Sequence, residues 1–410
     1  MDSKTLPHPS TLPLLLLLSA SLFFTVASGA GICINYGQIA DNLPIPEKVV
    51  PLIKSIHAAR LRLYDADPRV LAAFANTGVE FTVGLGNEYL ANMTDPDKAL
   101  TWVKNNVQCY LPATKITSIS VGNEVLTSND PSLSSNYLLT AMVNIHAALV
   151  SLKLGKEVMV TTAQNFGILE VSYPPSAGAF RQNLTQILKS ILDFHCKVDS
   201  PFMINAYPFF AYKNNPKIPL NYVLFEGDGI VDPISSFHYD NMFYAQIDAA
   251  HSAMAKLGYA NMCLQVAETG WPSKGDDDEA GASPENAEKY NKNLLKLINA
   301  NKGTPMRPDL DLNVCVFALF NENLKTGPTS ERNFGLFNSD MTPVYDLGFN
   351  VKGVGNTNSS ISDGGTTPST TPPGLFESPD GLFNAVDAER ASFRGALLSL
   401  LCLTILALQL

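Results

Sequence analysis

The feature that most constrains this chain is an alternation between short apolar runs and segments of helical periodicity. Eight runs rich in Val, Ile, Phe or Cys lie between residues 32 and 322. They read ICINYG, ARLRLYD, EFTVGLG, ITSISVGNEV, EVMVTTAQNF, FMINAYPFF, MCLQVAETG and LNVCVFALFNE. Most of them lack strict apolar–polar alternation, and near-continuous apolar strands are typical of a parallel sheet that is covered by helices.

The segments between these runs carry the marks of helices. After the fourth run, apolar residues recur at steps of three or four until Gly155, and after the sixth run a similar stripe ends at Gly258. After the seventh run, Ser283 and Pro284 form a typical helix start. Eight strand–helix units in about 320 residues predict a (β/α)8 TIM barrel. An open doubly wound sheet is the alternative, but it would carry a glycine-rich phosphate loop after its first strand, and NYGQIADNLP is not one.

Both ends of the chain differ in composition from this predicted catalytic domain, which we place at residues 31–350. Residues 1–30 contain LLLLLSASLFFTVASGA and end in small residues, which predicts a cleaved signal peptide rather than a membrane anchor. Residues 351–384 are rich in Ser, Thr, Pro and Gly and predict a flexible linker.

Residues 385–410 end in ALLSLLCLTILALQL, without a basic flank. A small site, a polar spacer and an apolar tail predict a signal for glycosylphosphatidylinositol (GPI) attachment, with Asn384 as the attachment residue and the tail removed. A tail-anchored helix is the alternative interpretation.

Charge and glycosylation sequons limit the classes of partner. The net charge is −10 and no long basic stretch occurs, which argues against a nucleic-acid partner. The sequons at Asn92, Asn183 and Asn358 predict N-linked glycans if the chain is secreted.

The six cysteines predict neither a disulfide framework nor a zinc site, because their spacings are wide and no C-x-x-C occurs. Cys402 lies in the removable tail, which leaves an odd number. Cys33, Cys263 and Cys315 lie inside apolar runs, where we expect buried free thiols.

The ends of the predicted strands carry the candidate functional residues, because the active site of a (β/α)8 barrel lies at the C-terminal ends of its strands. The polar and charged residues there are Arg62, Asn123, Glu124, Asn205, Glu268, Glu322 and Lys325, and the aromatic ones are Tyr36, Tyr64, Tyr207, Phe209 and Trp271. Glycoside hydrolysis needs a pair of carboxylates, for which Glu124 and Glu268 are the candidates, and aromatic rings that stack on sugars.

Each of these residues has a plainer interpretation when it is taken alone. A Glu at a strand end is most often a surface or salt-bridged group, Asn123 or Asn205 could form a turn, and Tyr207 could be a core ring. Lys325 could be a solvated loop lysine, and Trp271 could plug the barrel rim. The joint pattern is what favours a site.

Other chemistries have weaker support. The histidines show no H-E-x-x-H spacing and no G-x-S-x-G motif is present, which argues against a metalloprotease and an α/β-hydrolase. The acidic run Asp276–Glu279 lacks the spacing of an EF-hand and is interpreted as a solvated loop. No metal or cofactor is predicted.

Six stretches together resemble a known family. CINYGQIADNLP, RLYD, SVGNEV, NAYPFFAY, AETGWPS and ERNFGLF are similar, in order and at the expected intervals, to the plant β-1,3-glucanases of glycoside hydrolase family 17. The resemblance covers residues 32–349 and implies a retaining endo-β-1,3-glucanase with a long open cleft. The chain departs from the usual pattern in the more acidic loop KGDDDEAG and in having no cysteine-rich carbohydrate module after the barrel.

The resemblance also implies roles for individual residues. Glu124 matches the acid/base and Glu268 the nucleophile, while Glu322 and Lys325 match an auxiliary pair. Asn123 matches a contact to a sugar 2-hydroxyl, and Tyr207 matches a group that orients the nucleophile; Tyr36, Tyr64, Asn205, Phe209 and Trp271 are further candidates for substrate contacts.

Two carboxylates about 5–5.5 Å apart repel each other, so we expect Glu124 to be protonated at rest and Glu268 to be ionised, with Lys325 balancing charge. The expected partners are β-1,3-glucan polysaccharide of the callose type and, through a GPI lipid, the outer leaflet of the plasma membrane. The expected protein is a monomer at the cell wall. A β-1,3-glucan transglycosylase and a non-hydrolytic surface glucan-binding protein are the alternatives.

Overall fold

The computed structural model describes residues 31–130, 133–300 and 302–349. The predicted signal peptide, linker and GPI signal lie outside these residues, as do Asn358, Asn384 and Cys402.

Eight parallel strands close into a barrel in the order β1-β12-β11-β8-β5-β4-β3-β2. The strands are β1 (Ile32–Asn35), β2 (Ala58–Arg62), β3 (Glu80–Leu85), β4 (Lys115–Asn123), β5 (Met159–Asn165), β8 (Phe202–Asn205), β11 (Leu264–Thr269) and β12 (Val314–Val316). Each lies within, or within one residue of, one of the eight apolar runs. The prediction of a (β/α)8 barrel is therefore confirmed.

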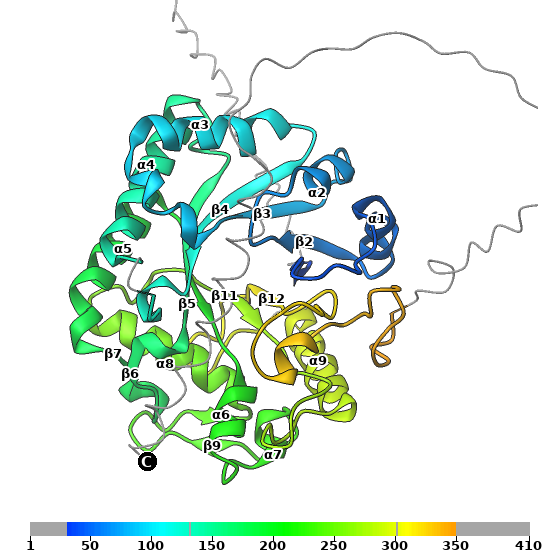
Figure 1. Ribbon diagram of the computed structural model, residues 1–410. Coiled ribbons are helices and arrows are strands. Elements are labelled where there is room, and N and C mark those ends of the chain that lie inside the picture. Colours follow the sequence, from blue (N-terminus) through cyan, green and yellow to red (C-terminus); the bar gives the residue numbers. More distant parts are fainter. Residues whose placement is uncertain (1–30, 131–132, 301, 350–410) are drawn as a thin grey trace, which may run out of the picture.

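Helices surround the strands (Figure 1). The longer ones are α1 (Pro46–Ser55), α3 (Pro96–Asn106), α4 (Ser135–Ser151), α5 (Thr185–Val198), α8 (Met242–Lys256) and α9 (Pro284–Asn299), and the short helix α2 (Pro68–Ala73) follows β2. Several begin at a side chain that caps free backbone N–H groups: Asp95 does so for α3, Ser134 for α4, Asn241 for α8 and Ser283 for α9. The start of α9 lies where the Ser-Pro pair predicts it.

Smaller elements lie in the loops that follow β5 and β8. They are the antiparallel pairs β6 (Leu169–Val171) with β7 (Ala179–Phe180) and β9 (Ile230–Val231) with β10 (His238–Tyr239), and the short helices α6 (Pro208–Asn214) and α7 (Leu220–Val223). Single turns of 3-10 helix are η1 (Asn87–Tyr89), η2 (Asn92–Thr94), η3 (Gln108–Tyr110), η4 (Val125–Thr127), η5 (Phe166–Ile168), η6 (Pro175–Ala177), η7 (Gln182–Leu184) and η8 (Thr329–Arg332).

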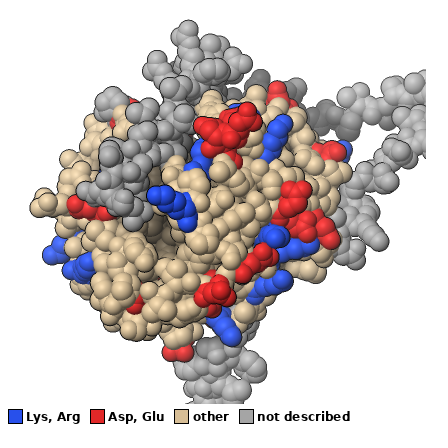
Figure 2. All heavy atoms as spheres, turned by 90° about the horizontal axis from the view of Figure 1, so that it is seen from below, with Lys and Arg blue, Asp and Glu red and all other residues tan. Residues whose placement is uncertain are grey.

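The core lies between the barrel and the helices. Leu52 and Ile53 of α1, Ile145 of α4 and Leu294 of α9 are fully or almost fully buried. Burying one such side chain contributes about 1.5–3 kcal/mol, so the packed stripes of the helices hold the outer ring on the barrel. Acidic and basic side chains are mixed over the face of the molecule shown in Figure 2.

A disulfide between Cys33 and Cys315 joins β1 to β12. The two cysteines are register partners in this pair of strands, which is where the first and last strands of the barrel meet. The expectation of free thiols was wrong here, because a sequence separation of 282 residues hides a contact that only closure of the barrel creates. The expectation was also wrong for Cys263, which is free but exposed.

Over the part of the chain that the structure describes, the helices are all too short or too polar to cross a lipid bilayer.

Candidate active site

Glu124 lies immediately after β4 and has a left-handed backbone conformation, with φ of 56°. Its backbone N–H donates to the carbonyl of Ala163 on β5 at 2.8 Å. A non-glycine residue in this conformation costs free energy and is common at functional sites. The turn ends the strand and starts η4.

The carboxyl group of Glu124 is held by two amides. Asn205 Nδ2 donates to Oε1 at 2.7 Å, and Asn165 Nδ2 donates to Oε2 at 3.2 Å. Burial of the carboxyl and the nearby charge of Glu268 raise the pKa of Glu124 to about 7, and the two amide donors oppose that rise. Glu124 can therefore exchange a proton near neutral pH.

Glu268 lies on β11 and is 6% exposed. Its Oε1 accepts from Arg62 Nη1 at 2.7 Å, and its Oε2 accepts from the hydroxyl of Tyr207 at 2.9 Å. A buried carboxylate is tolerated when it is paired and hydrogen-bonded on both oxygens. This pairing explains how the apolar strand can end in a charge.

Arg62 is the cation at the centre of this arrangement and is 1% exposed. Besides Glu268, it donates from Nη2 to Asn123 Oδ1 at 2.9 Å and from Nη1 to Asn35 Oδ1 at 3.4 Å. The guanidinium carbon lies 4.7 Å from the centre of the Tyr64 ring. The sequence placed Arg62 at the mouth but did not predict that it holds Glu268, and it gave no sign of Asn35.

Asn205 links the two carboxylates. It is the register partner of Glu268 in the β8–β11 pair, and its side chain donates to Glu124. Glu124 and Glu268 therefore lie at the same mouth of the barrel, close enough for the charge of one to raise the pKa of the other. Asn123 and Asn205, expected as sugar contacts, both have protein partners, Arg62 and Glu124 respectively.

Glu322 and Lys325 lie beside this pair, after β12. Glu322 is 3% exposed, and its Oε1 accepts from the backbone N–H of Ile39 at 2.8 Å. Lys325 Nζ is 3.5 Å from Glu322 Oε2 and 4.1 Å from the centre of the Phe317 ring. A β-carbon on Gly37 would lie 2.5 Å from the Glu322 carboxylate, so the loop after β1 needs glycine there.

Glu331 on η8 is a further carboxylate of the mouth that the sequence analysis missed. Burial raises its pKa, with the charges of Glu268 and Glu279 adding to the shift and Lys325 opposing it. It lies in ERNFGLF, a stretch that carried the family resemblance.

Comparison with known proteins now identifies the domain. The model of glycosyl hydrolases family 17 matches residues 32–349. The chain belongs to this family.

Similar relatives support the assignment. The chain is 57% identical to glucan endo-1,3-beta-glucosidase 11 of Arabidopsis thaliana, over 83% of this chain and 81% of that protein. It is 55% identical to glucan endo-1,3-beta-glucosidase 10 of the same plant, over 85% and 83%. A solved structure, the β-1,3-glucanase and pollen allergen of Cryptomeria japonica, matches with a TM-score of 0.75 and 40% identity, over 78% of this chain and 99% of that one.

Three of the aromatic residues expected to stack on sugars are buried in this family 17 domain. Tyr36, Phe209 and Trp271 are at most 1% exposed, so the expectation that they offer an open ring face was wrong. Trp271 donates from Nε1 to the carbonyl of Gly281 at 2.8 Å and packs with its ring centre 5.2 Å from that of Phe209. It plugs the rim, which was the plainer interpretation of this residue.

Partly exposed aromatic rings remain at the mouth. Tyr64 and Tyr207 are partly exposed, as expected of substrate contacts, and so is Phe210, the neighbour of the buried Phe209. The ring centres of Tyr207 and Phe210 are 5.2 Å apart. Phe209 and Phe210 both lie in the first turn of α6, and the rotation of this helix decides which ring faces the core. The sequence does not show that rotation, so the wrong phenylalanine of the pair was chosen.

The acidic run was interpreted as a solvated loop, and Asp276, Asp277 and Asp278 are exposed, but Glu279 at its end is buried and braces η8. Glu279 is 3% exposed and accepts from Lys213 Nζ at 2.7 Å and from the backbone N–H of Ser330 at 2.9 Å. Asp276 accepts from the backbone N–H and the hydroxyl of Thr329. The run therefore fixes η8, which carries Glu331. In residues 31–130, 133–300 and 302–349 no group of three or more His, Cys, Asp or Glu side chains could hold a metal ion.

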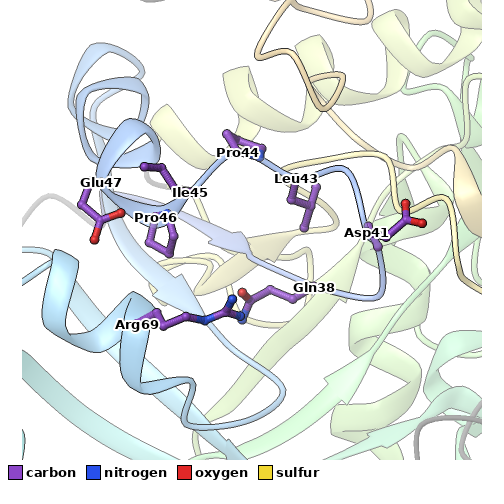
Figure 3. A pocket seen from close by; sticks show the side chains of 9 residues that line it. Gln38, Asp41, Leu43, Pro44, Ile45, Pro46, Glu47 and Arg69 are labelled. Carbon is purple, nitrogen blue, oxygen red and sulfur yellow. The ribbon is translucent and has the colours of Figure 1, made fainter. Parts of the chain in front are cut away.

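Two hollows of about 400 Å³ each adjoin the loop after β1. Figure 3 shows one, in which Arg69 of α2 reaches toward Gln38 beneath the segment of Leu43, Pro44 and Ile45. The other is lined by Asn42, Asn321, Asn323, Arg332, Asn333, Asn338 and Ser339. Neither is lined by Glu124 or Glu268, but Ile39 of the same loop binds Glu322, so both hollows flank the mouth.

The sequons at Asn92 and Asn183 lie in 3-10 turns, and both asparagines are exposed. Their glycosylation stays a prediction.

Proposed function

We propose that the protein hydrolyses β-1,3-glucosidic bonds within β-1,3-glucan chains, with retention of anomeric configuration. The observation that carries this proposal is a pair of carboxylates in opposite environments at one barrel mouth. Glu268 is paired with a buried cation, whereas the pKa of Glu124 is raised to about 7. Two carboxyl groups in such different environments can act as an acid and as a nucleophile. The names of the relatives and of the similar solved structure supply the substrate class.

In the first step, Glu124 donates its proton to the glycosidic oxygen as the bond to the leaving sugar breaks. Glu268 attacks the anomeric carbon and forms a glycosyl ester. The hydrogen bonds from Arg62 and Tyr207 hold both oxygens of Glu268 in place before attack. The departing chain carries the proton away as a hydroxyl group.

In the second step, a water molecule attacks the anomeric carbon from the side that the leaving sugar vacated. Glu124, now a carboxylate, takes the proton of that water, and Glu268 leaves as a carboxylate that Arg62 again stabilises. Two inversions at one carbon give retention. Both proton transfers pass through Glu124, so its pKa near neutrality serves both directions.

The other residues of the mouth have supporting roles in this proposal. Lys325 balances the negative charge of Glu322 and Glu331. Tyr64, Tyr207 and Phe210 offer partly exposed rings for sugar faces.

The test is activity of the purified protein on linear β-1,3-glucan, compared with mixed-linkage glucan and cellulose. We expect rapid release of short oligosaccharides from the β-1,3-glucan alone, and loss of that release in Glu268→Gln and Glu124→Gln. Glu80→Gln is the matched control, because Glu80 lies at the start of β3, where it pairs with Lys115 on the surface. Products longer than the substrate would favour a transglycosylase, and binding without turnover would favour a glucan-binding protein.

We also propose that the chain is secreted and held at the cell surface by a GPI lipid. The apolar start, the polar linker and the apolar tail of the sequence support this proposal. Release of the protein from intact cells by a phosphatidylinositol-specific phospholipase, lost on deletion of residues 385–410, is the expected result. Protein that stays with the membrane after this treatment would point to a tail-anchored helix.

A further inference from the structure

Asn165 is the last residue of β5 and the register partner of Asn205 on β8, which in turn pairs with Glu268 on β11. The three residues form one rung across neighbouring strands. Asn165 and Asn205 both direct Nδ2 to the carboxyl group of Glu124. The family assignment and the sequence analysis give no role to Asn165.

The orientation of the Asn165 amide is fixed by a second hydrogen bond. Its Oδ1 accepts from the backbone N–H of Gly167 at 2.9 Å, where it caps η5. A backbone N–H can only donate, so it must face the amide oxygen, and the amide nitrogen is left facing Glu124. Asn165 therefore cannot turn to offer an acceptor to a protonated Glu124 without losing its cap.

The two amides hold Glu124 unequally. Asn205 Nδ2 is 2.7 Å from Oε1, whereas Asn165 Nδ2 is 3.2 Å from Oε2. The longer bond to Oε2 is the weaker of the two, so Oε2 is the oxygen that takes up the exchanging proton more readily. An amide N–H that faces this oxygen favours its ionised form.

We propose that Asn165 is a positioning residue that holds Oε2 of Glu124 for proton transfer and favours its carboxylate form, thereby setting the alkaline limit of activity. The proposal rests on the proposed function, since it assumes that Glu124 is the acid/base. The ionisable groups that interact electrostatically with Glu124 are Glu268 from β11, Glu331 from η8 and Tyr207 from the segment after β8. The two glutamates act against ionisation, so the amides from β5 and β8 are what oppose them.

The test is the dependence of kcat/KM on pH for Asn165→Ala and Asn165→Ser, with linear β-1,3-glucan as substrate. Loss of one hydrogen bond to the carboxylate should move the alkaline limb of the pH profile to higher pH by roughly one unit. Serine can still cap Gly167 through its hydroxyl group but is too short to reach Glu124, so it removes the donor and keeps the cap. If Asn165→Ala does not fold, Asn165→Ser alone tests whether the donor to Glu124 sets the alkaline limb.

Asn215→Ala is the matched control, because Asn215 caps the backbone N–H of Lys217 in the same way, at 3.2 Å, after helix α6. Its pH profile should equal that of the wild type. A second substrate, a β-laminaribioside with a dinitrophenol leaving group, needs no acid for bond cleavage, so the shift of the alkaline limb should disappear with it.

An alkaline limb that stays in place, or moves to lower pH, in Asn165→Ser would overturn the inference. So would an equal shift on both substrates, because the effect would then not pass through Glu124 as an acid. Absence of turnover by the wild type would instead refute the proposed function, so the two failures are distinguishable.

Discussion

Removing Arg62 should destabilise the protein far more than removing an ordinary ion pair. Arg62→Met keeps most of the apolar stem but deletes the guanidinium group, which donates to Glu268 at 2.7 Å and to Asn123 at 2.9 Å. Arg62 is 1% exposed, so little water can replace it. Leaving Glu268 charged and unpaired should lower the free energy of unfolding by about 3–5 kcal/mol.

A double-mutant cycle isolates the part of this cost that belongs to the pair. Arg62→Met, Glu268→Gln and the double variant are unfolded in urea at pH 6, and the interaction free energy is taken from the four stabilities. We expect a coupling of about 2–3 kcal/mol, because the double variant no longer buries an uncompensated charge.

The matched control is the cycle of Lys115 and Glu80, whose nitrogen–oxygen distance is also 2.7 Å but whose side chains are 56% and 33% exposed. Water screens this pair, so its coupling should be roughly 0.2–1 kcal/mol. If the two cycles give the same coupling, the argument that burial makes Arg62 the essential partner of Glu268 is wrong.

Three further predictions concern Glu124, Glu279 and two aromatic residues. The folded pKa of Glu124 is about 7, above its unfolded value of 4.5. The contribution of this group to stability is therefore present below pH 4.5 and is lost as the pH rises through 7. In urea unfolding, Glu124→Gln should be more stable than the wild type by roughly 1–3 kcal/mol at pH 8, but not at pH 4. Glu279→Gln weakens the pairing with Lys213 and Ser330, so it should lower the free energy of unfolding by about 2–4 kcal/mol. It should also reduce kcat, because η8 carries Glu331. An unchanged melting temperature would contradict the bracing role of Glu279. Trp271→Ala should cost about 3–5 kcal/mol of stability as a core residue, whereas Phe210→Ala should chiefly raise KM for glucan; the reverse outcome would restore Trp271 as a sugar contact.

The barrel and its mouth could be predicted from two general rules, one on sequence pattern and one on barrel geometry. Apolar runs of strand length, separated by helical stripes, leave few parallel architectures, and the strand ends of a barrel meet on one face. Glu124 and Glu268 could therefore be placed together although they are remote in sequence. The start of α9 could be predicted because Ser283 and Pro284 satisfy helix-end chemistry by themselves.

Features that depend on register and rotation could not be predicted in this way. The Cys33–Cys315 disulfide exists because closure aligns two particular residues of β1 and β12. Phe209 and Phe210 are equivalent in the sequence, and only the rotation of α6 buries one of them.

The structural role of Glu279 was missed because its partners come from distant segments. Lys213 follows β8 and Ser330 follows β12, and no pattern within KGDDDEAG reveals them. Asn165 was missed for a similar reason, since a single asparagine at a strand end gains meaning only when its neighbours across β5 and β8 are known.

The most direct test of the account is to trap the covalent intermediate. A laminaribiosyl fluoride with fluorine at C2 destabilises the transition states of both steps, while its good leaving group lets the first step proceed. Peptide mass mapping of the inactivated protein should find the sugar as an ester on Glu268, and Glu268→Gln should take up none. A label on another carboxylate, or no label together with products of inverted configuration, would contradict double displacement by Glu268 and Glu124.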